Sequence, residues 1–247
     1  MEHWFRNYGI SIGLILGLLL QFKPLSAQEK QVNRSNQQWV QYYHRRNLSA
    51  KWLLSYDAGW RQRDELKNPS QALARAGMHF RPNNSTLLGA GFALFFFFRD
   101  DKLSRTELRP YQELMFNSGD SKIAINHRIR AEERMFSEVS EDQGFNQFNF
   151  RFRYRLQATI PILQFGKAGR GRELSAQIAD EVFINAGKTI VYNALDNNRI
   201  IAGSVIKCNE NLQVSLSYMF QFGQRNSPGV YESSDVLWLT FVHTTSR

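Results

Sequence analysis

Three arginines alternate with aromatic and aliphatic residues in one segment, FNFRFRYRLQ, residues 148–157. Arg151, Arg153 and Arg155 fall on one side of an extended chain, because successive side chains in a β-strand point to opposite faces. Their guanidinium groups carry permanent charges and bind carboxylates through several N–H donors. The spacing therefore predicts a row of ion pairs on one face of a strand and a purely apolar surface on the other face.

Acidic residues that could partner these arginines include two adjacent pairs, Glu132-Glu133 and Asp180-Glu181. Paired acids can also act as the acid and base of a glycosidase. However, neighbouring residues on a strand point to opposite faces, which separates the two members of each pair. We therefore interpret Glu132 and Glu181 as counter-ions for the arginines and predict no catalytic acid pair.

The histidines form neither a metal site nor an evident catalytic site. Their spacing repeats on no common face of a strand, so we predict no metal and no cofactor. His127 is expected to face outward, where a Ser-His lipid hydrolase site would lie, but its neighbour on that face is Ile129 rather than a serine. A triad assembled from distant strands stays open as an alternative. The five histidines are His3, His44, His79, His127 and His243.

Alternation of apolar and polar residues recurs along most of the chain, which predicts an all-β fold. Many of the alternating segments run 12 to 16 residues, against about 5 to 6 for a usual soluble strand. A tilted strand needs that length to cross a bilayer. The predicted strands are residues 37–44, 49–63, 71–81, 87–99, 105–116, 121–136, 148–162, 173–185, 199–208, 212–224 and 235–243.

The apolar side chains of these strands are too large to pack together inside a small closed barrel. In the segment 148–157 almost every apolar position is an aromatic ring or a leucine, and large apolar residues recur on most of the predicted strands. A soluble β-sandwich or lipocalin-like barrel would have to bury them all and would overfill its core. An outer surface that faces lipid has no such volume limit. We therefore predict a single antiparallel transmembrane β-barrel of 10 to 12 strands, with a soluble periplasmic β protein as the alternative.

The predicted strand number conflicts with the even count of single-chain bacterial barrels. Eleven segments are predicted. Either residues 189–192 belong to a twelfth strand, or the short segment 37–44 is not a full member of the barrel.

One hairpin register satisfies both faces of two neighbouring predicted strands. A two-residue turn at 118–119 places Glu107 opposite Arg130 and Arg105 opposite Glu132, and it also matches apolar residues on the other face. The inward faces of the strands are then expected to form a charge network that lines a polar lumen. Its predicted members are Arg105, Glu107, Arg109, Arg128, Arg130, Glu132, Arg151, Arg153, Arg155 and Glu181.

The beginning of the chain has the build of a secretory signal peptide. It combines Arg6, a mostly apolar run over residues 8–22, and the small residues Ser26 and Ala27, after which we expect cleavage. Pro24 argues against a membrane anchor, because it breaks a helix.

The resulting organisation is a signal peptide (1–27), an N-terminal periplasmic segment (28–36) and an outer-membrane β-barrel (37–247). The chain carries a formal net charge of +9 and one cysteine, so no intramolecular disulfide supports the fold. Nucleic acid is not expected as a partner of an exported protein, although aromatic and basic residues interleave as they do on base-stacking sheets.

Several segments that follow one another along the chain resemble an uncharacterised family of bacterial outer-membrane barrels, the domain of unknown function family 2490. The resemblance implies a single barrel exported to the outer membrane, and it implies no known activity. It therefore supplies no catalytic residues. The resembling segments are QQWVQYYHRRNLSAKW (37–52), PSQALARAGMHF (69–80), TELRPYQE (106–113), NHRIRAEERMF (126–136), NFRFRYRL (149–156), DEVFINAGK (180–188) and VYNALDNNR (191–199).

We predict a structural or weakly permeable barrel in the outer membrane of a Gram-negative bacterium, and not an enzyme. If the lumen conducts, its excess of arginine should favour anions. The expected partners are outer-membrane lipid and, during biogenesis, the barrel-assembly machinery; no solute or protein partner is predicted. The alternatives are a soluble periplasmic binding module, an exported nucleic-acid or glycan binder, and an outer-membrane lipid hydrolase.

Overall fold

The computed structural model describes residues 30–120, 122–140, 144–165 and 172–246. The predicted signal peptide lies outside these residues. Within them, no helix is long and apolar enough to cross a membrane. The compact unit Gln31–Arg247 is built from strands, which are β1 (Gln31–Asn47), β2 (Trp52–Arg63), β3 (Asn68–Asn83), β4 (Thr86–Arg99), β5 (Lys102–Gly119), β6 (Ala124–Glu138), β7 (Gln147–Phe165), β8 (Arg172–Ala186), β9 (Leu195–Lys207), β10 (Leu212–Gln224) and β11 (Val230–Ser246).

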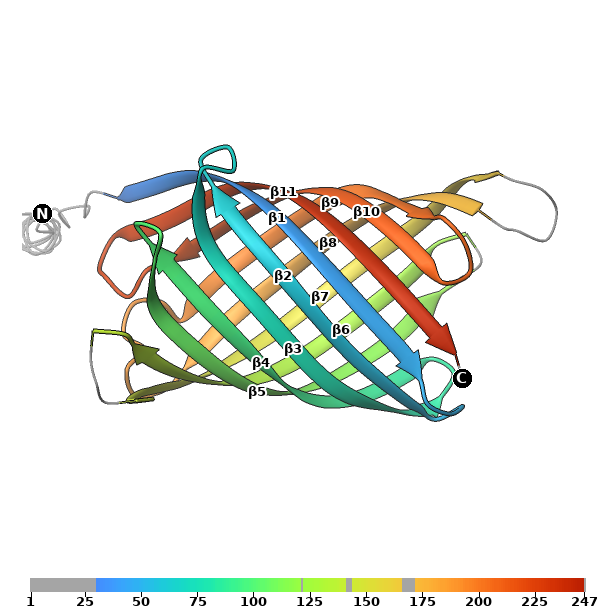
Figure 1. Ribbon diagram of the computed structural model, residues 1–247, viewed down its shortest axis with the longest axis horizontal. Helices are drawn as coiled ribbons and strands as arrows, with labels where there is room; N and C mark the ends of the chain where they lie inside the picture. The colour runs from blue at the N-terminus through green and yellow to red at the C-terminus, as the bar shows by residue number, and fades with distance from the viewer. Residues whose placement is uncertain (1–29, 121, 141–143, 166–171, 247) are drawn as a thin grey trace, which may run out of the picture. The chain divides into compact units, whose positions relative to one another are not determined.

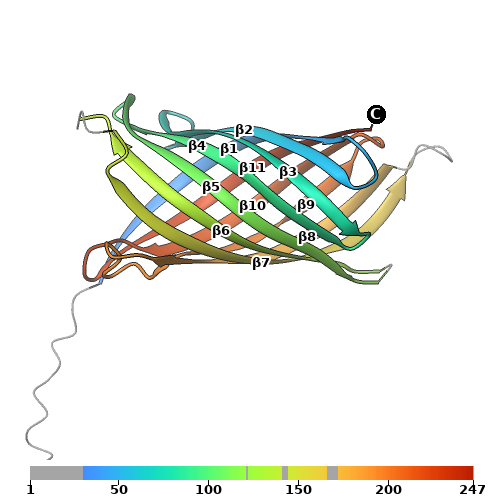
Figure 2. The same ribbon diagram turned by 90° about the horizontal axis from the view of Figure 1, so that it is seen from below.

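These strands form one closed barrel, in which each strand pairs with its neighbours in sequence and β1 pairs with β11 (Figures 1 and 2). Consecutive strands are antiparallel, whereas β1 and β11 are parallel from Gln31↔Val230 to Asn47↔Ser246. We call this parallel pairing the seam. It follows from the odd number of strands, because the first and the last of eleven alternating strands run in the same direction. The predicted all-β fold and strand number are confirmed, and the expectation of purely antiparallel pairing is wrong at the seam.

Because the number of strands is odd, β1 begins at one end of the barrel and β11 finishes at the opposite end (Figure 1). We call the end at which β1 begins the N end and the end at which β11 finishes the C end. The N end carries the connections that follow β2, β4, β6, β8 and β10, and the C end carries the others.

β1 is a full member of the barrel. It begins at Gln31, six residues before the predicted start at residue 37, and it pairs with both β2 and β11. Residues 189–192 form no strand. Neither of the two predicted ways to restore an even strand count is therefore right, because the parallel seam accommodates the odd count.

The hairpin of β5 and β6 has a different register from the predicted one. The structure pairs Glu113 with Arg130 and Arg105 with Glu138, a shift of six residues from the expected pairing. A shift by an even number keeps every side chain on its predicted face, because the side-chain period of a strand is two. The prediction was therefore wrong in the partners and right in the faces.

The turn between these strands explains the shift. β5 continues through the predicted turn and ends at Gly119, whose φ of 102° is unfavourable for other residues. The Asp120 side chain then accepts hydrogen bonds at Oδ1 from the backbone N–H groups of Ile123 (3.0 Å) and Lys122 (2.8 Å). These bonds lower the pKa of the Asp120 carboxyl. Asp120 therefore fixes the turn three residues later than the residue pattern alone indicated.

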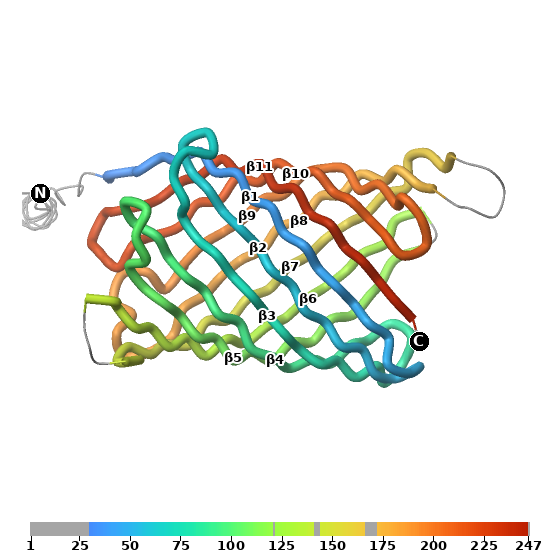
Figure 3. The backbone as a smooth tube through the Cα atoms, viewed as in Figure 1, coloured from blue at the N-terminus to red at the C-terminus, as the bar shows by residue number. Residues whose placement is uncertain are grey.

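The strands run obliquely around the barrel (Figure 3), with polar side chains inside and apolar side chains outside. β7 shows the division most clearly. Arg151 and Arg153 are 7% and 8% exposed, and Arg155 is half-buried. Their neighbours on the outer face are 41–49% exposed, namely Phe150, Phe152, Tyr154 and Leu156.

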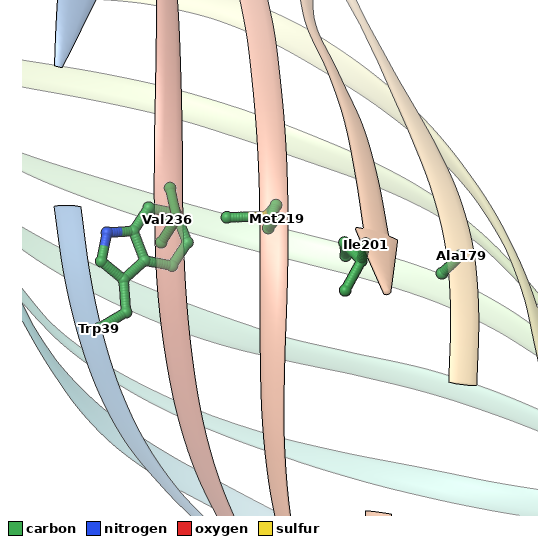
Figure 4. Close-up of a cluster of buried hydrophobic side chains, with 5 residues drawn as sticks. All are labelled: Trp39, Ala179, Ile201, Met219 and Val236. Carbon is green, nitrogen blue, oxygen red and sulfur yellow. The ribbon is translucent and has the colours of Figure 1, made fainter. Parts of the chain in front are cut away.

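Apolar side chains fill part of the interior. One cluster comes from β1 and β8–β11 and consists of Trp39, Ala179, Ile201, Met219 and Val236 (Figure 4). A second cluster on β3 and β4 consists of Leu73, Ala93 and Phe95, with Phe97 packed against it. The interior therefore has apolar walls on both sides of the polar strands β5–β7.

Candidate functional site: a charged layer inside the barrel

Glu132 on β6 is the centre of a network of buried ion pairs. Arg151 donates from Nε to Glu132 Oε2 (2.8 Å), and Arg153 donates from Nη1 to Oε1 (2.6 Å). Arg130 Nη1 lies 3.8 Å from the same carboxylate. The Glu132 side chain is only 3% exposed, so these arginines replace water as its hydrogen-bonding partners.

Glu181 on β8 extends the network along the barrel. Its Oε1 accepts hydrogen bonds from Arg153 Nε (2.9 Å) and from Arg128 Nη2 (2.7 Å). Two like-charged pairs face each other directly across β6 and β7, Arg130 with Arg153 and Arg128 with Arg155. Such pairs are destabilising by themselves, so the carboxylates from β5, β6 and β8 are what make this arrangement tolerable.

Glu107 on β5 continues the network toward the N end. It accepts hydrogen bonds from Arg109 Nη2 (2.7 Å) and from Arg134 Nε (2.7 Å), and it is fully buried. Asp196 on β9 then joins Arg151, at 3.0 Å from Nη1, to Arg134, at 3.9 Å.

Glu113, also on β5, anchors the part of the network nearest the C end. Arg130 Nε donates to Glu113 Oε2 (2.9 Å), and His79 Nε2 lies 2.8 Å from Glu113 Oε1. Nearby, Arg75 donates from Nε to Asp57 Oδ2 (2.9 Å). Each of these carboxylates therefore holds at least one guanidinium group.

Aromatic rings support the arginines on their flat faces. The guanidinium carbon of Arg109 lies 3.6 Å from the centre of the Phe95 ring, and that of Arg153 lies 4.4 Å from the centre of Phe183. Stacking of this kind leaves the N–H groups at the edge free to bind carboxylates. The rings thus fix the direction in which the arginines donate.

We call the buried ion pairs of this network the charged layer. Two cavities lie on either side of it, one of about 700 Å³ at the C end and one of about 580 Å³ at the N end. They share no lining residue. Phe183, Met219, Val236 and Glu107 line neither cavity and are at most 1% exposed. The middle of the interior is therefore filled by side chains.

The structure joins most of the predicted members into this network. Arg105 lies outside the buried layer, with Nη1 3.9 Å from Glu138 at the N end. Arg155 donates to Gln157, and no carboxylate oxygen of the described residues lies within 4.0 Å of it. The joined members are Glu107, Arg109, Arg128, Arg130, Glu132, Arg151, Arg153 and Glu181.

Sequence reasoning missed Glu113, Arg134, Asp196 and His79 as members. Glu113 and Arg134 share the inward parity of their strands, so the alternation contained the signal; the wrong register paired Arg130 with Glu107 and left Glu113 without a role. Asp196 falls between the predicted strands 173–185 and 199–208, and no pattern in the sequence marks it as an inward strand residue.

On the outer face near the C end, three polar side chains from β5, β6 and β7 meet. Ser118 Oγ lies 3.1 Å from His127 Nε2, and His127 Nδ1 lies 2.9 Å from the Tyr154 hydroxyl. His127 also stacks on Phe116, with ring centres 4.3 Å apart. A serine does therefore lie beside His127, but it comes from the adjacent strand and not from the position of Ile129. In the described part of the chain, no group of His, Cys, Asp or Glu is arranged to hold a metal ion.

Comparison with known proteins identifies a family. A model of a protein family described as a protein of unknown function, DUF2490, matches residues 36–232. No curated protein and no solved structure matches. The match spans β2 to β10, most of β1 and the first residues of β11, and thus covers every residue of the charged network. The chain belongs to the DUF2490 family of proteins of unknown function.

Proposed function

We propose that the protein is an outer-membrane β-barrel of a Gram-negative bacterium, and that it is structural or only weakly permeable. The observation that carries this proposal is the distribution of polarity. The ion pairs lie inside the barrel, while large apolar side chains such as Phe92 (63% exposed), Phe152 (49%) and Leu237 (52%) lie on its surface. A water-soluble barrel would have the opposite arrangement, because an apolar surface of this extent favours association or lipid.

Two exposed tryptophans support a membrane-spanning orientation of the strands. Trp52 and Trp60 lie on the outer face of β2, near its two ends. Trp52 contacts Phe80 on β3, and Trp60 contacts Phe98 on β4. They are eight positions apart, which is about 26 Å along a strand and about 20 Å along the axis of a barrel with tilted strands. That spacing is close to the height of the apolar band between the two aromatic girdles of an outer-membrane barrel, about 25 Å.

The filled middle of the interior supports low permeability. A solute would have to pass Phe183, Met219 and the pairs formed by Glu107 and Glu132, all of which are buried. Any small current should prefer anions, because inward arginines outnumber their carboxylate partners at both cavities.

The membrane location is tested by the behaviour of the purified protein. An outer-membrane barrel should need detergent for solubility, show β-type circular dichroism and migrate differently on gels with and without heating. A stable monomer without detergent would overturn the proposal and favour the soluble periplasmic binding module. Planar-bilayer recordings then test permeability: we expect small or no currents, and large cation-selective currents would refute the assigned role of the charged layer.

A second function, lipid hydrolysis, is favoured by the contact of Ser118 with His127 on the outer face. A serine hydroxyl within hydrogen-bonding distance of an oriented histidine is the minimum for a nucleophile. The third group is the neutral hydroxyl of Tyr154, which stabilises an imidazolium less than a carboxylate does, and for that reason this is the weaker candidate. Release of fatty acid from phospholipid vesicles that is abolished by both Ser118→Ala and His127→Ala would establish it; equal release by both variants and the native protein would exclude it.

A further inference from the structure

Two arginines at the N-end cavity have no carboxylate partner among the described residues. Arg61 on β2 and Arg199 on β9 both line this cavity, and for neither of them does a carboxylate oxygen of the described residues lie within 4.0 Å. Arg61 donates to Gln71 Oε1, and Arg199 donates from Nε to Gln221 Oε1 (3.1 Å). A neutral amide oxygen uses one of the five N–H donors of a guanidinium and does not neutralise its charge. Glu181, which is opposite Arg199 in the register of β8 and β9, offsets part of the charge of Arg199, whereas Arg61 has no carboxylate opposite it.

Both guanidinium groups lie on one tryptophan. The guanidinium carbon of Arg61 is 3.7 Å from the centre of the Trp39 ring, and that of Arg199 is 5.4 Å from it. The two carbons are therefore at most 9.1 Å apart, which is the sum of these two distances. Trp39 is 3% exposed and is held by its own hydrogen bond from Nε1 to Gln37 (2.9 Å). The ring thus fixes two like charges near each other (Trp39 is drawn in Figure 4).

Two further arginines that line this cavity each have an unused donor. The Nε atoms of Arg63 and Arg105, which also line the cavity, are buried without a hydrogen-bond partner among the described residues. The hydroxyls of Ser35 and Ser234, 2.8 Å apart, form part of the same wall. Seven arginines and three carboxylates, those of Glu138, Asp196 and Glu232, line this cavity of about 580 Å³. The excess of positive charge is the chemistry of an anion site.

We infer that the N-end cavity binds the phosphate group of a small soluble molecule between Arg61 and Arg199. Like charges fixed this close repel each other, and an anion between them removes the repulsion and uses the free N–H groups. A phosphate offers three or more oxygens and can accept from two guanidinium forks at once, whereas a carboxylate has only two oxygens. The site lies inside the barrel and does not depend on the proposed membrane location.

The direct test is a calorimetric titration of the detergent-solubilised full barrel with inorganic phosphate, with glucose 1-phosphate and with acetate. We expect saturable binding of one or both phosphates and clearly weaker binding of acetate. Tighter binding of glucose 1-phosphate would identify a phosphorylated sugar as the ligand class, and equal binding would identify the phosphate alone. Absence of saturable phosphate binding, or acetate binding as tightly as phosphate, would overturn the inference.

Matched variants locate the site. Arg61→Gln and Arg199→Gln should each weaken phosphate binding at least about tenfold, because each removes a charge-assisted pair of hydrogen bonds. Arg155→Gln is the control, since Arg155 is also an inward arginine without a close carboxylate but lines the other cavity. Equal weakening by all three variants would refute the assigned position.

Thermal unfolding of the same variants distinguishes a loss of phosphate binding from a loss of folded protein. Without phosphate, Arg61→Gln should leave Tm unchanged or raise it, because it removes an uncompensated charge. Phosphate should raise the Tm of the native protein and of Arg155→Gln, and not that of Arg61→Gln. A lowered Tm of Arg61→Gln in phosphate-free buffer, together with the same rise in Tm on adding phosphate as in the native protein, would show that Arg61 serves the fold and not a ligand site.

Discussion

Replacing Glu132 with glutamine should destabilise the barrel much more than the same change at Glu138. Both side chains belong to β6 and face inward, but Glu132 is 3% exposed and is bonded at 2.8 and 2.6 Å to two arginines, whereas Glu138 is 32% exposed and lies 3.9 Å from one. Loss of the Glu132 charge leaves Arg151 and Arg153 buried with only part of their compensation, from Asp196 and Glu181. Breaking a buried pair costs about 3–5 kcal/mol, against about 0–1 kcal/mol for an exposed pair.

The measurement is the free energy of unfolding of both variants and the native protein, from urea titrations in detergent micelles or vesicles followed by tryptophan fluorescence. A difference below about 1 kcal/mol between Glu132→Gln and Glu138→Gln would show that the buried network does not hold the barrel together. The double variant Glu132→Gln/Arg151→Gln provides a further check. It should be more stable than the sum of the two single changes indicates, because it removes a charge together with its partner.

Three further predictions follow from the two faces of the strands. Phe152→Arg should impair insertion into vesicles much more than Arg153→Phe, because an arginine on the lipid face near the midplane costs about 2–4 kcal/mol; equal insertion of the two variants would contradict the orientation of β7. Single cysteines for fluorophore labelling can be introduced in a Cys208→Ser background, which has no other cysteine. Labels at positions 150, 152 and 154 should be quenched by lipid-borne probes, and those at 151, 153 and 155 should not. A reversed or absent alternation would favour a soluble barrel. Phe183→Ala should raise single-channel conductance, because Phe183 is 1% exposed and lines neither of the two cavities, so that it fills space between them. Phe152→Ala on the outer face is the control and should leave the conductance unchanged. An equal change of conductance in both variants would show that Phe183 does not obstruct the interior.

The faces of the strands were predictable from the sequence, and the partners across strands were not. Alternation alone assigns Arg151, Arg153 and Glu132 to one side, because the side-chain period of two is a local property of the backbone. The pairing of β5 with β6 depends on where the chain turns, and Asp120 fixes that point through its side-chain hydrogen bonds. Hydrophobic matching could not detect the error, since a shift by six residues preserves both faces.

Contacts between strands distant in sequence were also beyond prediction. Asp196 of β9 contacts Arg151 of β7. The guanidinium groups of Arg61 on β2 and Arg199 on β9 both lie against the Trp39 ring on β1. Such contacts depend on the closure of the barrel, which no local pattern encodes. The same holds for the parallel seam, because the alternation of inward and outward residues in β1 and β11 is compatible with parallel and with antiparallel pairing.

The seam also has a consequence for the order in which the protein folds. Every other pairing joins neighbours along the chain and can form as a local hairpin, whereas the seam joins Trp39 to Trp238, 199 residues away. Bringing such distant residues together costs about 3 kcal/mol more chain entropy than closing a turn of a few residues, and parallel pairs are slightly weaker than antiparallel ones. The seam should therefore form last and open first. Until it forms, β1 and β11 are two unpaired edges, and their amide hydrogens should exchange with solvent sooner than those of β5–β8, where the ion pairs hold the sheet together.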